Sequence, residues 1–230
     1  MLKNTIPIDE LISNLPLFKE LDPHVIERLV RGITVIAAPK GTVLVRRGDA
    51  CTGLHIVVSG QVKLCLQALR GNEKVIGLLG LGESFGESAM FLDQPYRHTA
   101  EALLDSRLVH VSKATVLAGI ERDPRFACRV IARLSQRLSH FINEVETFTL
   151  RSGPQRVVTY LLKELGAQSR PDESAITLPA QKGVIASHLN LTQEHFSRIL
   201  HGLAAEGLIE VRGRTVRILN AQTLSSQAVS

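Results

Sequence analysis

Four polar residues in the C-terminal part of the chain could contact the edges of nucleic-acid bases. Gln193, Glu194, Ser197 and Arg198 stand at positions that share one face of a helix near its N-terminus. An arginine can donate two hydrogen bonds to guanine O6 and N7, a glutamate can accept one from cytosine N4, and a serine can contact a base or a phosphate. The pattern therefore predicts a base-reading helix that enters the major groove of DNA. An ordinary solvated helix face is the alternative interpretation.

The flanking sequence predicts the elements that hold this helix in place. Residues 182–189 form a short helix candidate, residues 190–191 a tight turn, and residues 193–206 a second helix. Thr192 suits the N-cap of the second helix, and Gly207 ends it. The expected core side of the second helix carries Phe196, Ile199, Leu200 and Leu203.

A β-hairpin is predicted after the second helix, with strands over residues 208–211 and 215–219. Two short helices joined by a tight turn and followed by a hairpin are typical of a winged helix-turn-helix. Basic and hydroxyl side chains around such a unit bind the DNA backbone rather than the bases. We expect backbone contacts from Lys182, Thr192, His201, Arg212 and Arg214.

A long amphipathic segment, residues 124–148, precedes this unit. Pro124 suits the first position of a helix, and residues 152–154 (Ser-Gly-Pro) suit its end. Its apolar residues alternate at spacings of three and four, which is the seam of a two-helix coiled coil. The segment predicts a dimer seam between two copies of the chain, whereas packing on its own domain is the alternative. The seam residues are Ile131, Leu134, Leu138, Phe141, Val145 and Phe148.

The sequence before the long helix predicts a small antiparallel barrel or sandwich. Short apolar runs alternate with turns that contain glycine, as in all-β domains. The strand candidates are residues 33–37, 43–46, 54–58, 61–66, 75–79, 100–104 and 108–111. Further helices are predicted over residues 8–15, 23–32, 113–120 and 155–165, and a loop over 168–174.

These elements predict an α+β protein of three parts. Residues 1–122 form an effector-binding barrel domain, residues 123–152 a dimerisation helix, and residues 153–230 a winged helix-turn-helix domain. No apolar run approaches the roughly 20 residues of a membrane span, and residues 1–7 lack the apolar core of a signal peptide. We therefore expect a cytoplasmic protein.

The charge and the cysteines narrow the function classes. The formal net charge of +5 permits binding to nucleic acid without requiring it. Cys51, Cys65 and Cys128 are scattered and show no CxxC spacing, which argues against a disulfide framework and against a cysteine-ligated zinc or iron–sulfur site. We expect all three to be small buried residues.

The combination of barrel, long helix and winged helix-turn-helix resembles the CRP/FNR family of bacterial transcription regulators. The resemblance covers nearly the whole chain and is most specific at residues 82–91 (GESFGESAMF) and 189–208 (LNLTQEHFSRILHGLAAEGL). Residues 146–162 and 193–209 are most similar to the DNR-like, nitric-oxide-responsive branch. The family implies a double-stranded β-helix (jelly-roll-like) sensor barrel, a homodimer on inverted-repeat DNA, and RNA polymerase as a partner.

The family patterns also bear on which operator is read. Glu194, Ser197 and Arg198 match the FNR-type pattern E-x-x-S-R, which implies half-sites like TTGAT. Cyclic-AMP receptor proteins have R-E-x-x-G-R here, so Gln193 and Ser197 disfavour a TGTGA-type operator.

The resemblance implies an effector pocket beside the long helix. In cyclic-nucleotide binders a glutamate after a glycine binds the ribose and an arginine about ten residues later binds the cyclic phosphate. Gly86, Glu87 and Arg97 have this spacing, but Arg97 falls one residue late when counted from the following strand, and a one-residue slip turns a strand side chain to the other face. His98 also replaces a small residue, and Phe141 and Ile142 replace a hydrogen-bonding Thr–Ser pair. The implied pocket comprises Gly86, Glu87, Ser88, Arg97, His98, Thr99, Phe141 and Ile142.

Haem is the other effector cofactor that the resemblance implies, because DNR-like proteins sense nitric oxide. His140, His98 and His188 are the candidate iron ligands, although each suits an ordinary surface or core position equally well. An iron–sulfur cluster is disfavoured because no cysteine cluster lies near the N-terminus, and the absence of CxxCH excludes covalent haem.

We thus predict a homodimeric, effector-gated transcription regulator that is not an enzyme. A cyclic-AMP-gated regulator, or a cyclic-nucleotide-binding signalling module whose helix-turn-helix contacts proteins, is the main alternative. Glu87 and His98 could be imagined as an acid–base pair, but no nucleophile, metal set or phosphate loop accompanies them.

Overall fold

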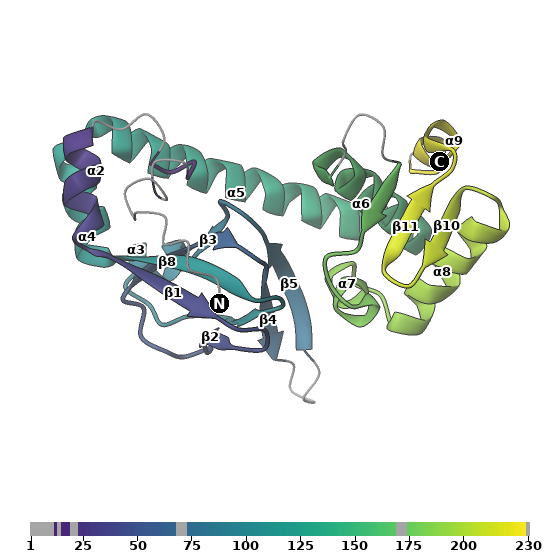
Figure 1. Ribbon diagram of the computed structural model, residues 1–230, viewed down its shortest axis with the longest axis horizontal. Helices are drawn as coiled ribbons and strands as arrows, with labels where there is room; N and C mark the ends of the chain where they lie inside the picture. Colours follow the sequence, from purple (N-terminus) through teal and green to yellow (C-terminus); the bar gives the residue numbers. More distant parts are fainter. Residues whose placement is uncertain (1–11, 13–14, 19–22, 68–72, 169–173, 229–230) are drawn as a thin grey trace, which may run out of the picture. The chain divides into compact units, whose positions relative to one another are not determined.

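The computed structural model describes residues 12, 15–18, 23–67, 73–168 and 174–228 (Figure 1). The chain divides into two compact units, Met1–Leu138 and Ser139–Ser230. Most of the helix predicted over residues 8–15 and most of the loop predicted over 168–174 lie outside the described residues. The three predicted domain boundaries remain predictions.

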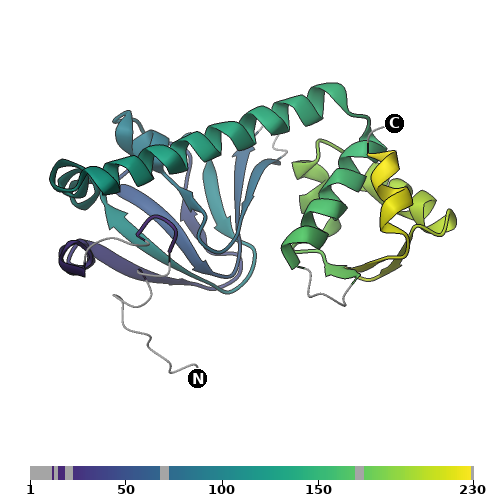
Figure 2. The ribbon, with the colours of Figure 1, turned by 90° about the horizontal axis from the view of Figure 1, so that it is seen from above.

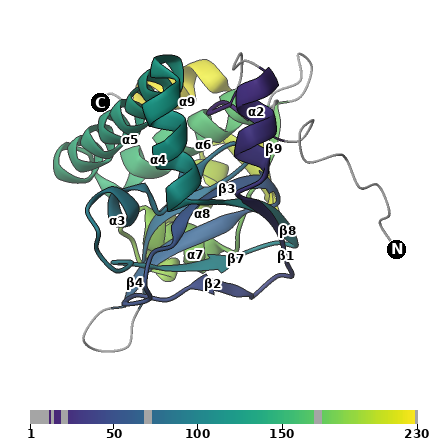
Figure 3. The ribbon, with the colours of Figure 1, turned by 90° about the vertical axis from the view of Figure 1, so that its left-hand side faces the viewer.

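The first unit is built on two antiparallel four-stranded sheets that face each other (Figure 3). One sheet has the strand order β1 (Ile33–Ala38), β8 (Ser106–Ser112), β3 (Gly53–Ser59), β6 (Ser84–Phe85). The other has the order β2 (Val43–Val45), β7 (Thr99–Ala102), β4 (Val62–Gln67), β5 (Glu73–Leu79).

Two hydrophobic cores lie on the two faces of the first sheet. Because side chains alternate along a strand, Leu108 points into the core between the sheets, whereas Val109 points into the core on the opposite face. That second core is completed by Phe126, Met90 and other side chains from the helices. These helices are α2 (Pro23–Val30), α3 (Glu87–Phe91), α4 (Lys113–Arg122) and the start of α5 (Pro124–Leu150).

Figure 2 shows α5 as one continuous helix. This helix is apolar on two different faces. Phe126 and Val130 are buried in the core of the first unit. In contrast, Ile131 is 61% exposed, Leu138 60% and Phe141 60%, and all three belong to the predicted dimer seam. The helix continues two residues beyond the predicted end at residue 148.

The second unit packs helices around a three-stranded antiparallel sheet. Val157, Leu161, Phe196, Leu200 and Val216 are among its buried side chains. Its helices are α6 (Gly153–Gln168), α7 (Lys182–His188), α8 (Gln193–Ala205) and α9 (Ala221–Gln227), and its strand order is β10 (Ile209–Arg212), β11 (Thr215–Ile218), β9 (Ala175–Thr177).

The predicted fold class is confirmed, with additions in both units. The sequence patterns did not predict β6, α3, β9 or α9, all of which are short. The expectation that all three cysteines are buried was wrong, because only Cys65 is buried, Cys51 is half-buried and Cys128 is exposed on α5. Among the described residues, no helix has the length and apolarity needed to cross a membrane.

The turn between α7 and α8 depends on an asparagine in a left-handed conformation. Asn190 has a φ angle of 58°, which side chains with a branched Cβ rarely tolerate. We expect Asn190→Val to lower the free energy of unfolding by about 1–2 kcal/mol and Asn190→Gly to change it far less. Urea unfolding of both variants measures this difference, and equal stability of the two would contradict the argument.

Candidate DNA-reading and effector sites

The helix α8 has the cap and the buried side that the sequence predicted. The Thr192 hydroxyl accepts a hydrogen bond from the backbone N–H of His195 at 3.2 Å. The four predicted core residues of α8 are buried: Phe196, Ile199, Leu200 and Leu203. Since these residues are fixed in the core, the orientation of the opposite face is fixed as well.

Three of the four predicted base-reading residues lie along the outward part of α8. Glu194 and Arg198 are exposed and Ser197 is half-buried. Gln193 is also exposed, but its side chain folds back over α7. A Cβ atom added to Gly183 would come within 2.7 Å of Gln193 Oε1, so the amide lies directly over the first turn of α7.

The predicted backbone-contacting residues differ in how free they are. Arg214 and His201 are exposed, and Lys182 is half-buried at the start of α7. Arg212 already has a partner, because its Nη2 and Nε atoms lie 2.6 and 2.9 Å from Glu210 Oε1. Of the two arginines predicted to bind the DNA backbone from the hairpin, Arg214 therefore has the more available charge.

The sequence reasoning missed an arginine that links α6 to the helix-turn-helix. Arg156 donates a hydrogen bond from Nη1 to the Leu189 carbonyl at 2.7 Å and to the Asn190 carbonyl at 3.2 Å. Only its charge could have drawn attention to it, because the acceptors are backbone atoms more than thirty residues away.

The space between the two sheets holds a cluster of histidines that the sequence reasoning also missed. His55 on β3 pairs in register with His110 on β8 and with Phe85 on β6, so the three rings share one face. The ring centroids of His55 lie 4.8 Å from His110 and 4.7 Å from Phe85. Tyr96 completes the cluster, as its hydroxyl donates to the Gly53 carbonyl at 3.2 Å and lies 3.4 Å from His55 Nδ1.

Burial changes the protonation of this cluster. Burial first, and then the neighbouring His110, together lower the pKa of His55 to about 3. Burial also lowers the pKa of His110. The pKa of His98 is lowered by burial first and then by the positive charge of Arg137. All three imidazoles are therefore held in the neutral form.

The predicted effector residues of the barrel do not converge on one point. Gly86 has a φ angle of 103°, and a Cβ atom there would lie 2.9 Å from the Gly53 carbonyl oxygen, so glycine is required. Glu87 follows it as the half-buried first residue of α3, next to an exposed Ser88. Thr99 is half-buried, and its hydroxyl accepts a hydrogen bond from the backbone N–H of Arg47 at 3.2 Å.

Tyr96, Arg97 and His98 come just before β7 and alternate in the side to which they point. Tyr96 is 2% exposed and points inward, whereas Arg97 is exposed and donates to Gln94 Oε1 at 2.9 Å. His98 turns inward again, with its ring 6.2 Å from Phe85, and its buried Nε2 atom has no hydrogen-bond partner among the described residues. No hydrogen bond or ion pair among the described residues joins Arg97 to Glu87, and the guanidinium is held outside the histidine cluster.

The remaining predicted residues belong to the second unit. Phe141 and Ile142 are exposed on α5 at 60% and 56%. His140 and His188, two of the three candidate haem ligands, line the same pocket of that unit. Among the described residues no cluster of three or more His, Cys, Asp or Glu could hold a metal ion.

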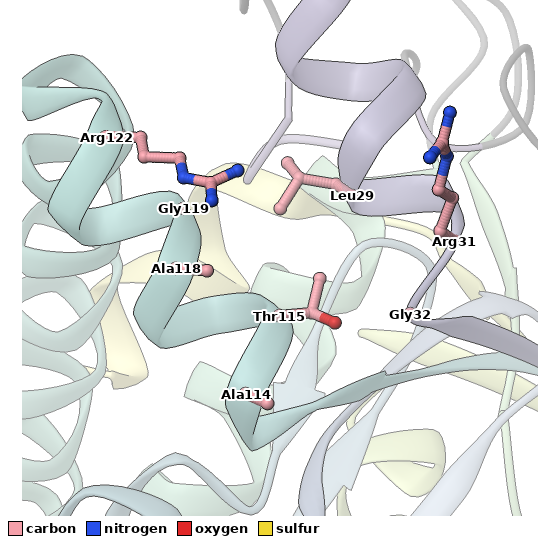
Figure 4. A pocket seen from close by; sticks show the side chains of 8 residues that line it. All are labelled: Leu29, Arg31, Gly32, Ala114, Thr115, Ala118, Gly119 and Arg122. Atoms are coloured by element: carbon pink, nitrogen blue, oxygen red, sulfur yellow. The ribbon is translucent and has the colours of Figure 1, made fainter.

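The first unit also has an outer pocket that the sequence did not indicate. It has a volume of ≈ 340 Å³ and lies between α2 and α4, lined by Leu29, Ala118, Gly119 and neighbouring residues (Figure 4). Arg122 extends across it from α4, whereas Arg31 projects away on the far side of α2 (Figure 4).

Comparison with known proteins identifies the class of protein. Residues 35–123 match the cyclic nucleotide-binding domain, and residues 155–226 match the Crp-like helix-turn-helix domain. The cyclic AMP receptor protein of Thermus thermophilus is 30% identical over 213 residues, which cover 93% of this chain and 96% of that protein. The chain therefore belongs to the CRP/FNR family, whose members are DNA-binding transcription regulators rather than enzymes.

Solved structures agree with this assignment. DNR from Pseudomonas aeruginosa is 32% identical, with a TM-score of 0.51 over 95% of this chain and 96% of that one. FixK2 from Bradyrhizobium japonicum has a TM-score of 0.76 over 84% of this chain and 96% of its own at 23% identity, which shows the shared fold alone.

The neutral histidine cluster predicts a loss of stability in mild acid. The unfolded chain binds a proton at His55 below a pKa of about 6.5, whereas the folded chain does not until about pH 3. Stability is therefore retained above pH 6.5 and falls as the pH decreases towards 3. Between pH 7 and 5 we expect a loss of about 2 kcal/mol from His55 alone.

Urea unfolding at several pH values tests this expectation. The His55→Gln variant should show a shallower decrease between pH 7 and 5, whatever its stability at pH 7. The exposed His201→Gln serves as the matched control and should retain the wild-type slope. An unchanged slope in His55→Gln would refute the assignment.

Proposed function

We propose that this protein is a homodimeric, effector-gated transcription regulator of the DNR-like branch, which reads an inverted repeat of TTGAT-like half-sites. The observation that carries the proposal is Arg198, exposed on α8 with no hydrogen bond or ion pair to any described residue. Glu194 lies one helical turn before it, on the same face. A guanidinium fork in this position can read a guanine in the major groove.

The apolar stripe of α5 supports a dimer. Its seam residues leave large apolar side chains in water, including Ile131, Leu138 and Val145. Pairing with the same stripe of a second chain removes them from water. This burial stabilises the dimer by about 25 cal/mol for each Å² of apolar surface buried. Two copies then present two α8 helices to one inverted repeat, and RNA polymerase is the partner that such a DNA-bound regulator recruits.

Arg198→Ala should abolish the preference for the specific operator. We expect a loss of about 1–3 kcal/mol in discrimination between a TTGAT-type repeat and scrambled DNA of the same length. Fluorescence anisotropy at fixed salt measures both affinities. Arg214→Ala, on the wing, should instead weaken both DNAs equally, because a phosphate contact carries no sequence information. A fully discriminating Arg198→Ala variant would overturn the proposal.

The barrel interior favours haem over a cyclic nucleotide as the effector-binding group. A phosphodiester needs a guanidinium to bind it, and Arg97 is held on the outside by Gln94. His98 suits haem iron, because its imidazole is neutral and its buried Nε2 has no partner among the described residues. Phe85 and Tyr96 provide flanking aromatic surface. A haem held there would supply an iron that binds nitric oxide.

Haem reconstitution distinguishes the two effector classes. Wild-type protein should give a ligated-haem absorption spectrum, and His98→Gln should lose it, while His140→Gln and His188→Gln retain it. Calorimetric titration with cyclic AMP should give no binding heat. Micromolar cyclic AMP binding that disappears in Arg97→Ala would instead establish the cyclic-AMP-gated alternative.

A further inference from the structure

An open pocket with many polar side chains in its wall lies in the second unit. It has a volume of ≈ 260 Å³ and is lined by the end of α5, by α6 and by the end of α7. Arg156, Thr159, Tyr160 and Lys163 line it from α6, at spacings that place them on one helix face. A helix face that packs on a neighbouring helix is usually apolar, so this concentration of polar side chains requires an explanation.

One residue of the wall carries an unsatisfied cationic donor. The Nε atom of Arg156 is buried and has no hydrogen-bond partner among the described residues, although Nη1 of the same side chain has two. A buried donor on a charged group costs more to leave unpaired than a neutral one. Lys163 adds a second, exposed cation to the wall. Among the described residues of the wall, Glu144 is the one carboxylate, so the cations there outnumber the anions.

The remaining walls suit the organic part of a ligand. Phe148 presents a ring from α5, and Leu189 adds apolar surface from the end of α7. Burial, and next the Glu164 carboxylate, raise the pKa of Tyr160, so its hydroxyl stays protonated. The volume lies just below the roughly 300–1,000 Å³ of typical small-molecule pockets, which limits the ligand to a small one.

Arg156 also connects the pocket to the turn that precedes the DNA-reading helix. Its Nη1 atom donates to the carbonyls of Leu189 and Asn190. Asn190 is the left-handed turn residue, and Thr192, two residues later, caps α8. A ligand that binds the other edge of this guanidinium therefore acts on the group that holds the start of α8.

We propose that this pocket is a second ligand site, which binds a small aromatic oxyanion through Arg156 and Lys163 and adjusts the position of the turn before α8. The charged oxygen of the ligand accepts a hydrogen bond from Arg156 Nε, and the aromatic ring of the ligand lies against Phe148. The site itself is independent of the function proposed above, whereas its effect on DNA reading rests on that function.

Binding of simple probes to the full-length protein tests the site. Phenyl phosphate and benzoate carry the ring with a phosphate or a carboxylate, and inorganic phosphate carries the charge alone. We expect saturable binding of one aromatic probe per chain by calorimetry, with inorganic phosphate at least about tenfold weaker. The stronger of the two aromatic probes identifies the oxyanion.

Variants localise the binding. Lys163 is exposed, so Lys163→Gln should not affect folding. This variant should bind the aromatic probe about tenfold more weakly, as expected for the loss of a charge-assisted hydrogen bond. Arg156→Lys should weaken it further. The matched control Arg217→Gln removes one exposed positive charge from β11 and should bind as the wild type does. Absence of saturable binding, or equal weakening in Arg217→Gln, overturns the proposal.

A direct readout of the guanidinium separates this site from the DNA-binding proposal. In a ¹H–¹⁵N spectrum of the arginine side chains, the Arg156 Nε–H signal, assigned by its absence in Arg156→Lys, should shift on addition of the probe. An unshifted signal would overturn the site. If the signal shifts but the protein does not discriminate operator DNA from scrambled DNA, the function proposed above is wrong. The ligand site is then still supported.

Discussion

The long helix α5 has two different apolar surfaces that must both be buried. Phe126 and Val130 are buried against the first sheet, so the rotation of the helix about its axis is fixed at its beginning. This rotation leaves a second stripe, from Ile131 to Val145, exposed along the rest of the helix. A chain alone cannot bury that stripe with any of its described residues, and exposed apolar patches of this kind mark association surfaces. Members of the family to which the chain belongs form dimers, and a dimer would bury this stripe.

The helix also links sensing to DNA reading through chain connectivity. It begins in the core of the first unit and ends in the second, next to α6. A ligand can shift an equilibrium only by as much as its affinities for two states differ. An effector in the barrel can act through interactions that α5 makes there, such as the charge of Arg137, which lowers the pKa of His98.

Much of the fold could be predicted because its signals are local. The spacing of Ile131, Leu134 and Leu138 predicted a helix with a seam, and Thr192 predicted the start of α8 to the residue. The core side of α8 was likewise predicted, because four apolar residues at helical spacing leave only one face to bury. Short elements such as β6 escaped prediction, since two residues carry no periodicity.

The candidate sites were less predictable because they depend on pairing between distant strands. His55 and His110 are more than fifty residues apart in the sequence, and only the register of β3 against β8 brings their rings together. Nor does helical spacing reveal that Gln193 folds back over Gly183, because that contact joins two separate helices. Arg156 meets backbone carbonyls, which have no sequence signature at all.

The alternation of Tyr96, Arg97 and His98 decides what chemistry the barrel interior can offer. Had the chain been shifted by one residue, the guanidinium would face inward and the phenol outward, as a bound phosphodiester requires. Instead Tyr96 is tied to the Gly53 carbonyl, which leaves Arg97 in solvent with Gln94. The groups that face inward are neutral imidazoles, a protonated phenol and the ring of Phe85, since burial lowers the pKa of each histidine and raises that of Tyr96. Such a lining offers neutral imidazole nitrogens and flat aromatic surface, and the Arg97 guanidinium contributes no charge to it.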